Sequence, residues 1–399
     1  MSNYSNISYE LTNQIEKKIK KEQGIFFTPP ITINHNLNII DSYITKCKTV
    51  LEPSCGSCEY INALYNKYPH LNITGIEYNQ TIFNSIKQYS NDNINLINTD
   101  FLLYNDNKTY DLIIGNPPFF VMKLKEVNKK YHEFFDGRPN IFILFIIKAI
   151  SLLNENGILS FVLPKNFMNC LYYNKTREYI NNNFTIIDIV DCQDKFIETQ
   201  QDTIILIIQK QQTLDNNKFI LNINDYTIFG IPNNISQLKS LYENSTTLYS
   251  MNFNVNVGTV VWNQHKDILT SDTSHTRLIY SSDIHNNKLI MKKYKNIDKQ
   301  NFINKHGINR PTLVINRGYG TGVYNFEYCL IKGGFDYLIE NHLICVNHMN
   351  SISNEQLISL YESIIHSLEN EKTKLFIKLY FGNNAINTTE LNYILPIYT

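Results

Sequence analysis

A ten-residue stretch decides the fold: Tyr110-Asp111-Leu112-Ile113-Ile114-Gly115-Asn116-Pro117-Pro118-Phe119. Its apolar, β-branched centre predicts a buried strand, so the last four residues should lie at the C-terminal tip of that strand. In an open α/β sheet, ligands bind at the carboxyl ends of the strands. The stretch therefore predicts both a sheet and the place of its functional site.

The four tip residues suit a planar amino group. Pro117 and Pro118 fix their φ angles and have no N–H, which leaves a stiff backbone with carbonyl acceptors. An amino group can donate one hydrogen to the Asn116 side chain and the other to the Pro117 carbonyl, while Phe119 stacks on its plane. A Pro-Pro turn that only ends the strand is the alternative. The flanking motifs decide between the two.

The composition is typical of a soluble globular protein: 399 residues, 43% hydrophobic and 18% charged. We expect two domains, no membrane span and no signal peptide, and hence a cytoplasmic location. Seven cysteines without a regular framework fit a reducing compartment, and the lone CxxC, at Cys55 and Cys58, has no partner motif that would predict a metal site. Formal net charge is zero. Residues 251–310, however, carry nine Lys or Arg against four Asp or Glu, a net of +5, which predicts a basic face there.

A strand–turn–helix motif precedes the opening stretch. Residues 49–52 predict a strand, and a tight turn through Gly56 leads into a helix at 59–67, so that backbone N–H groups can approach a ligand. A second strand, 73–77, ends on Glu77, 21 positions after Gly56. That is close to the spacing of about 20 residues at which an acid reaches a ribose diol. Together the turn and the acid indicate a nucleotide-type ligand.

Three other segments carry candidate binding residues. The strand 94–98 ends before Asp100 and Phe101, which suit an adenine amino group and an adenine face, although an Asp in this place is more often a helix cap. A solvated, Lys-rich helix is expected at 9–22, followed by Thr28, whose hydroxyl stands before two prolines. Phe196, in a polar loop at a sheet edge, is expected to be exposed, either packed under the loop or stacked against a flat substrate.

The alternation of strands and helices predicts a doubly wound α/β sheet that ends near Lys210. Its later members are expected as helices at 141–153 and 175–183 and as strands at 158–163, 186–191 and 203–209. Beyond Asn216, short β-like runs and a helical stretch at 354–380 predict a mixed α+β domain. A boundary near 230–234 divides the chain into domains 1–230 and 235–399.

In this order, the motifs resemble the gamma class of S-adenosylmethionine-dependent DNA adenine-N6 methyltransferases, as in type II restriction-modification systems. Phe27-Thr28-Pro29 looks like the motif at the methionine end of the cofactor, Leu51 to Ser57 like the first cofactor motif, and Asn116 to Phe119 like the catalytic signature. The resemblance implies S-adenosylmethionine bound by Thr28, Glu52, Pro53, Cys55, Gly56, Glu77, Asp100, Phe101 and Asn116. It implies a catalytic group of Asn116, Pro117, Phe119 and Phe196, with Phe196 against the flipped base. Two positions depart from the family: Cys58 replaces a second glycine, and Phe119 replaces a common tyrosine.

The resemblance also implies duplex DNA as the partner of a Rossmann-like catalytic domain and a target-recognition domain. The target adenine flips out of the duplex at a cost of a few kcal/mol, and its N6 attacks the methyl group directly without a strong base. Candidate DNA contacts are Lys123, Lys125, Lys129, Lys130, Trp262, Arg317 and Pro396. The lysine-rich loop lies either against phosphates or on a solvated surface. A monomer is expected, with a separately encoded endonuclease as a further partner.

Three alternatives stay open from the sequence. N4-cytosine methylation presents the same planar amine to Asn116, and so does methylation of a protein glutamine. An inactive DNA-binding subunit is the alternative outside enzymes. Cytosine-C5 methylation is disfavoured because it needs a nucleophilic cysteine, usually after proline, and the chain has no Pro-Cys dipeptide.

Overall fold

The computed structural model of the chain describes residues 4–105, 107–192, 194, 196–211, 215–317, 326–380 and 386–399. It divides into two units, residues 1–235 and residues 236–399. No helix in these described ranges is long and apolar enough to cross a membrane.

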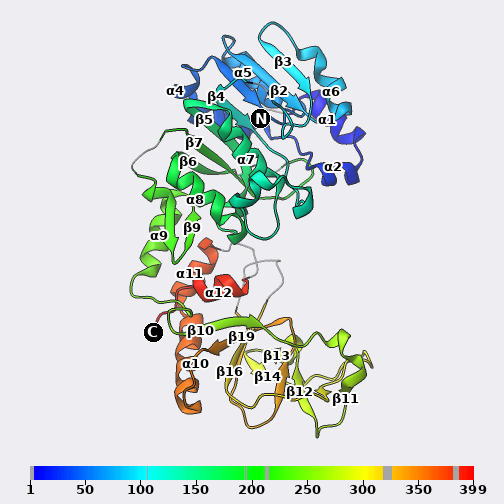
Figure 1. The fold of residues 1–399 in the computed structure, drawn as a ribbon, viewed down its shortest axis with the longest axis vertical. Helices are drawn as coiled ribbons and strands as arrows, with labels where there is room; N and C mark the ends of the chain where they lie inside the picture. Colours follow the sequence, from blue (N-terminus) through cyan, green and yellow to red (C-terminus); the bar gives the residue numbers. More distant parts are fainter. Residues whose placement is uncertain are drawn as a thin grey trace. The chain divides into compact units, whose positions relative to one another are not determined.

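One seven-stranded sheet organises the first unit, in the order β3-β2-β1-β4-β5-β7-β6 (Figure 1). Its strands are β1 (Thr49–Glu52), β2 (Asn72–Glu77), β3 (Ile94–Asn98), β4 (Tyr110–Gly115), β5 (Leu153–Pro164), β6 (Thr185–Cys192) and β7 (Thr203–Gln209). All neighbours pair in parallel except β7, which is antiparallel to both β5 and β6. The predicted doubly wound sheet is confirmed. Its strand order reverses between β1 and β4, which is where such sheets bind ligands.

Helices cover both faces of this sheet. They are α1 (Asn6–Gln14), α2 (Lys17–Gln23), α3 (Pro30–Ile39), α4 (Asp41–Ile44), α5 (Glu59–Lys67), α6 (Gln80–Ile86), α7 (Ile141–Ser151) and α8 (Asn174–Asn183). Successive strand residues point to opposite faces. Val50 accordingly belongs to the buried cluster that contains residues of α3 and α5, and Leu51 to the cluster that contains residues of α7.

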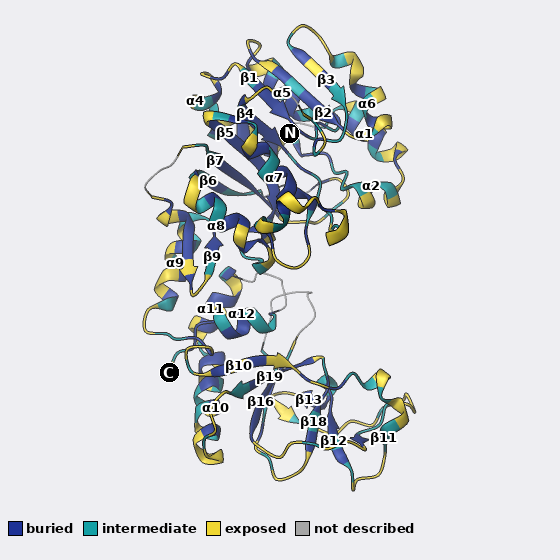
Figure 2. Cartoon of the chain, in the orientation of Figure 1, coloured by how far each residue is buried: buried dark blue, intermediate teal, exposed yellow. Residues whose placement is uncertain are grey.

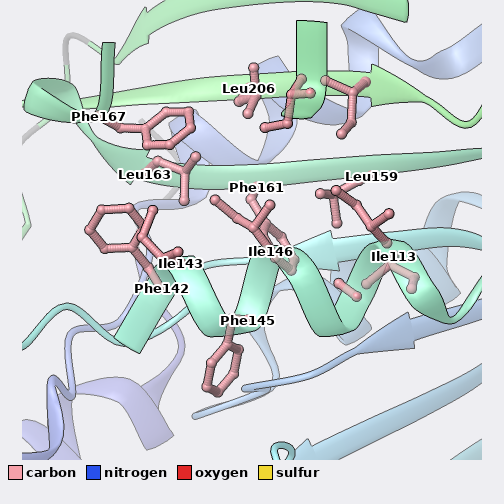
Figure 3. Close-up of a cluster of buried hydrophobic side chains, with 14 of the residues drawn as sticks. Ile113, Phe142, Ile143, Phe145, Ile146, Leu159, Phe161, Leu163, Phe167 and Leu206 are labelled. Atoms are coloured by element: carbon pink, nitrogen blue, oxygen red, sulfur yellow. The ribbon is translucent and has the colours of Figure 1, made fainter. Parts of the chain in front are cut away.

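Helix α7 is the centre of the second of these clusters. Figure 3 shows Phe142 and Ile146 of α7 directed toward the β5 side chains Leu159, Phe161 and Leu163. Burying one such side chain stabilises the fold by about 1.5–3 kcal/mol, so this helix fixes the sheet firmly. Phe145 points the other way, away from β5, and so is available to line a cavity at the strand tips.

The N-terminal segment differs from the prediction of one solvated helix at 9–22. The helix breaks after Gln14, because Ile15 is extended (φ −85°, ψ 128°), and α2 starts at Lys17. Leu11 and Ile15 pack with Phe27 and Ile82, and the predicted solvent exposure is wrong for them. Figure 2 shows α1 with buried as well as exposed turns.

The second unit contains two four-stranded sheets, of order β10-β19-β16-β17 and β11-β15-β12-β18. The first has strands β10 (Phe253–Val257), β16 (Thr312–Asn316), β17 (Tyr328–Ile331) and β19 (Leu343–His348); the second has β11 (Leu269–Thr270), β12 (Thr276–Ile279), β15 (Phe302–Ile303) and β18 (Tyr337–Ile339).

Instead of the one helix expected at 354–380, α10 (Asn354–Glu369) and α11 (Glu371–Tyr380) flank an extended Asn370. The chain also forms the hairpins β8 (Ile220–Ile223) with β9 (Tyr226–Phe229) and β13 (Ile284–His285) with β14 (Lys288–Leu289), and the helices α9 (Pro232–Tyr242) and α12 (Thr388–Tyr393). The glycine-rich turn at 318–322 lies outside the described residues.

Candidate active site

A cavity of about 340 Å³ opens at the C-terminal tips of β1, β2, β3 and β4. Of the predicted cofactor residues, it is lined by Pro53, Gly56, Glu77, Asp100, Phe101 and Asn116. Three more, Thr28, Glu52 and Cys55, line a smaller cavity of about 30 Å³. Both cavities share Phe26, Phe27, Ser54, Gly56 and Asn116 in their walls, so they adjoin. The structure thus brings all nine predicted cofactor residues to one edge of the sheet.

Glu77 connects two strand tips. Its Oε2 accepts the Gly56 N–H at 2.9 Å, and its Oε1 accepts the Asn79 N–H at 2.6 Å. Burial nevertheless raises the pKa of this carboxyl to about 7, because desolvation of the charge outweighs these hydrogen bonds. A ribose diol at this wall would donate to the carboxylate and favour its charged form.

Asp100 and Phe101 form the wall beside β3. Asp100 Oδ1 accepts the Leu102 N–H at 2.8 Å, so this oxygen also caps the turn. Phe101 is buried and lies 4.9 Å from the Phe145 ring, centroid to centroid. Both rings line the cavity, which gives a planar ligand an apolar slot next to a carboxylate.

Cys58 shows why a glycine suits its position. Its backbone is left-handed, with φ 64° and ψ 25°, at the start of α5, and its side chain is fully buried. This conformation costs an L-residue about 1–2 kcal/mol, and glycine adopts it freely. Cys58 therefore carries strain in the turn that holds Gly56.

Asn116 has one satisfied and one free end. Its Nδ2 donates to the Phe26 carbonyl at 3.1 Å, and its Oδ1 is buried with no hydrogen-bond partner among the described residues. A carbonyl can only accept, so the Phe26 oxygen fixes which way the amide faces. A buried acceptor without a partner costs about 1–3 kcal/mol. The Oδ1 atom is therefore an oriented, vacant acceptor for an N–H donor.

The backbone that carries Phe26 approaches the catalytic tip closely at Gly24. Gly24 has φ +66°, and a Cβ added there would lie 2.7 Å from Phe119 N and 2.9 Å from Pro118 Cβ. Only glycine fits this contact. The same segment is tied to the start of α6, where Asn79 Nδ2 donates to Gln23 Oε1 at 2.8 Å. The N-terminal segment is thus part of the site, which the sequence indicated at Thr28 but not at Gly24 or Phe26.

Phe119 and Phe196 do not face each other. Phe119 packs edge-on against Phe142, with centroids 6.0 Å apart, in the α7 cluster. Phe196 is only 5% exposed and belongs to the cluster on the other face of the sheet. The expectation of an exposed Phe196 is wrong: the ring packs inward despite its polar sequence neighbours, in a cluster that does not contain Phe119.

The candidate DNA contacts fall into three groups. Lys123, Lys125, Lys129 and Lys130 are exposed in the loop after the catalytic tip, and Arg317 is exposed at the end of β16. Trp262 is half-buried, with Lys266 and Lys299 over its ring at 5.9 and 5.7 Å. Pro396 is buried, so the prediction that it contacts DNA is wrong. Its apolar neighbours Leu395 and Ile397 are fully buried and hold this terminal stretch inside the unit.

Several lining residues escaped the sequence analysis, among them Gly24, Phe26, Tyr78, Ile141 and Phe145. Gly24 and Phe26 come from the N-terminal segment and Ile141 and Phe145 from α7, where no tip motif points, whereas Tyr78 directly follows Glu77 at the tip of β2. Gly24 alone left a signal, as a glycine at the end of a helical pattern and next to Phe26-Phe27-Thr28.

Comparison with known proteins finds one matching methylase family and several relatives named as methylases or methyltransferases. Residues 33–197 match the model of the family described as Eco57I restriction-modification methylase. The modification methylase CviBIII of Paramecium bursaria Chlorella virus NC1A is 33% identical over 181 residues, which cover 44% of this chain and 47% of that protein. The type II methyltransferase M.CvrRI of Paramecium bursaria Chlorella virus XZ-6E is 24% identical over 401 residues, 100% of both chains. The chain therefore spans about half the length of the first relative and the full length of the second.

A solved structure supports the fold alone: the DrdV–DNA complex has a TM-score of 0.52 at 11% identity, covering 95% of this chain and 57% of that chain. The strand order, the antiparallel β7 and the cavity at the strand tips define the first unit as a doubly wound α/β fold with a candidate ligand site where the strand order reverses. The first unit is similar to the Eco57I restriction-modification methylase family over residues 33–197, less than half of the chain.

Proposed function

We propose that the chain is a site-specific DNA methyltransferase that modifies N6 of an adenine flipped out of duplex DNA. The observation that carries the proposal is the vacant acceptor of Asn116, buried at the wall shared by the two cavities. The methylase family match and the relatives named methyltransferases support transfer of a methyl group to DNA.

The tip cavity fits the cofactor by its donor and acceptor set. Glu77 would hold the ribose hydroxyls, Asp100 and Phe101 the adenine, and the Gly56 turn the chain between them. Thr28 and Glu52 would lie toward the methionine end, where Glu52 Oε2 is buried without a partner in the described part of the chain. S-adenosylmethionine, when bound there, supplies an electrophilic methyl group.

The catalytic tip would hold the amino group of the base. Asn116 Oδ1 accepts one amino hydrogen, and the Pro117 carbonyl accepts the other, since neither Pro117 nor Pro118 has an N–H that would compete. Holding both hydrogens withdraws the nitrogen lone pair from the ring and orients it. Phe119 lies beside the base plane. The Phe26 carbonyl keeps Asn116 in its acceptor orientation before the base arrives.

Residues 235–399 would form the target-recognition domain. Their early part carries the net charge of +5, which suits a polyanion, and half-buried Trp262 and exposed Arg317 are candidates for base or backbone contacts. The proposal extends to a cytoplasmic, monomeric enzyme that works beside a separately encoded cognate endonuclease.

Asn116→Ala tests the catalytic assignment. We expect methyl transfer into unmodified, polymerase-amplified DNA to fall at least about a hundredfold, the typical cost of losing one preorganised polar group. Affinity for S-adenosylhomocysteine should stay within a few-fold, because Glu77, Asp100 and the Gly56 turn remain. Ser54→Ala is the matched control: it removes only the hydroxyl that donates to the Asn116 backbone carbonyl at 3.0 Å. Full transfer by Asn116→Ala would refute the role.

The same assay separates the alternatives. N4-cytosine methylation would use the same acceptors, and a glutamine carboxamide presents the same planar amine. Labelled methyl groups in added release-factor protein, with none in DNA, would overturn the proposal in favour of the protein substrate.

A further inference from the structure

A second cavity, of about 830 Å³, lies in residues 236–399. Its floor is the small sheet: β12 pairs in parallel with β18 and antiparallel with β15. The charged and ring-bearing groups in its wall include Arg277, Lys305, His275, His306, Phe335 and Asp336. Asp336 is the one carboxylate among its lining residues. The wall therefore has a cationic bias that the catalytic unit does not explain.

Arg277 is the unusual member of this wall. Its Nε and Nη2 atoms are buried, and neither has a hydrogen-bond partner in the described part of the chain. Burial lowers the pKa of its guanidinium from the ordinary value. The Phe335 ring covers it at 5.8 Å from centroid to guanidinium carbon. Two donors of a half-buried cation are thus held in place without an acceptor among the described residues.

The two unpaired atoms form one edge of the guanidinium. Their N–H bonds run parallel, in the geometry that pairs with two acceptor oxygens of one phosphate or carboxylate. Leaving both donors unmet while buried costs more than leaving two neutral donors, since the group is charged. Such an arrangement is expected where a ligand supplies the acceptors.

Resting on the proposed function, which brings duplex DNA to this chain, we propose that this cavity seats the sugar-phosphate backbone, with Arg277 holding one phosphate in a bidentate pair. Lys305 is exposed at the same wall and supplies a second positive charge. The cavity is larger than one phosphate needs, so a stretch of backbone fills it better than a free anion does. A phosphate here would position the duplex without reading its sequence.

Arg277→Met and Lys305→Met test the seat in the full-length chain. Binding of a labelled, mixed-sequence duplex is measured over a series of salt concentrations. We expect Arg277→Met to weaken binding about ten- to a hundredfold and to reduce the slope of log K against log salt by about 0.9. Lys305→Met should reduce the slope by a similar amount. Arg277→Lys should keep the slope and lose part of the affinity, because it retains the charge and not the parallel donors.

The matched control is Lys332→Met. Lys332 is 66% exposed, pairs with Glu362 of α10 at 3.4 Å and is not among the residues that line the cavity. Binding and slope should equal those of the wild type. Melting curves confirm folding of each variant.

Two results would overturn the seat. An unchanged slope in both Arg277→Met and Lys305→Met refutes the phosphate contact. A loss confined to duplexes that contain particular guanines, with the slope intact, assigns Arg277 to a base edge instead. Methyl transfer by the wild type into amplified DNA is measured in parallel. If the wild type transfers no methyl group, the proposed function is refuted. If it transfers methyl groups while the slope is unchanged in both variants, only the proposed phosphate contact is refuted.

Discussion

Gly24→Ala probes the contact between the N-terminal segment and the catalytic tip. The left-handed φ of +66° costs an alanine about 1–2 kcal/mol. The new Cβ would also lie 2.7 Å from Phe119 N, where ordinary contacts need about 3.5 Å, so the segment must retreat by roughly 1 Å. That shift breaks the 3.1 Å hydrogen bond between Asn116 Nδ2 and Phe26 O, which costs about 0.5–1.5 kcal/mol more.

The expected loss is therefore about 2–3 kcal/mol in the free energy of unfolding, measured by urea denaturation. Methyl transfer should slow at least about tenfold, because the Asn116 amide is no longer held as an acceptor. Gly334→Ala is the matched control for stability: its φ is +89°, and an added Cβ meets nothing within 4 Å. Gly334→Ala should lower the free energy of unfolding only by the cost of the left-handed backbone, about 1–2 kcal/mol. If Gly24→Ala loses no more stability than Gly334→Ala and keeps full transfer, the account of the N-terminal segment is refuted.

Two further predictions concern the cofactor loop. Because the pKa of Glu77 is raised from 4.5 to about 7 in the fold, its stabilising contribution is present below pH 4.5 and is lost as pH rises through 7. The free energy of unfolding should fall by about 3 kcal/mol over that range in the unliganded wild type relative to Glu77→Gln, while affinity for S-adenosylhomocysteine rises; parallel urea titrations of the two proteins would contradict this. Cys58→Gly should change stability by less than about 1 kcal/mol, since relief of the left-handed strain offsets the lost burial. Cys47→Gly, at a buried cysteine without positive φ, should cost about 2 kcal/mol or more, and equal losses would show that Cys58 is unstrained.

The strands of the catalytic sheet were predictable because their residues encode them locally. The runs at 49–52, 94–98, 110–115 and 203–209 begin and end where expected, since β-branched residues are bounded by turn-forming ones. The tips of β1 to β4 converge because parallel strands share one carboxyl edge. That is why eight of the nine cofactor candidates chosen from the sequence, all except Thr28, lie together at the walls of two adjoining cavities.

Contacts between distant segments were not predictable in the same way. The lysine-rich helix expected in solvent instead buries Lys20, whose Nζ donates to Thr12 O at 2.6 Å and pairs with Glu198 at 2.7 Å. Phe196 lies in the same loop as Glu198 and is buried, although its neighbours are polar. The Lys20–Glu198 pair joins segments nearly 180 positions apart, and Phe196 packs in a cluster whose other members lie outside its loop. No local pattern records either contact.

The cavity at Arg277 likewise depends on contacts between segments that are distant in the sequence. Its wall joins residues near 275, 305 and 335, and none of these runs carries a motif. The sequence supplied only the excess of positive charge in this region. The unpaired edge of one arginine is a property of the folded sheet.

The central claim is that Asn116 presents a vacant acceptor to the amino group of an adenine. It is tested most directly by incubating the wild-type chain with amplified DNA and isotope-labelled S-adenosylmethionine, digesting the DNA to nucleosides and identifying the labelled product by mass. We predict labelled N6-methyladenine, absent when Asn116→Ala replaces the wild type. Labelled N4-methylcytosine without N6-methyladenine would contradict the account.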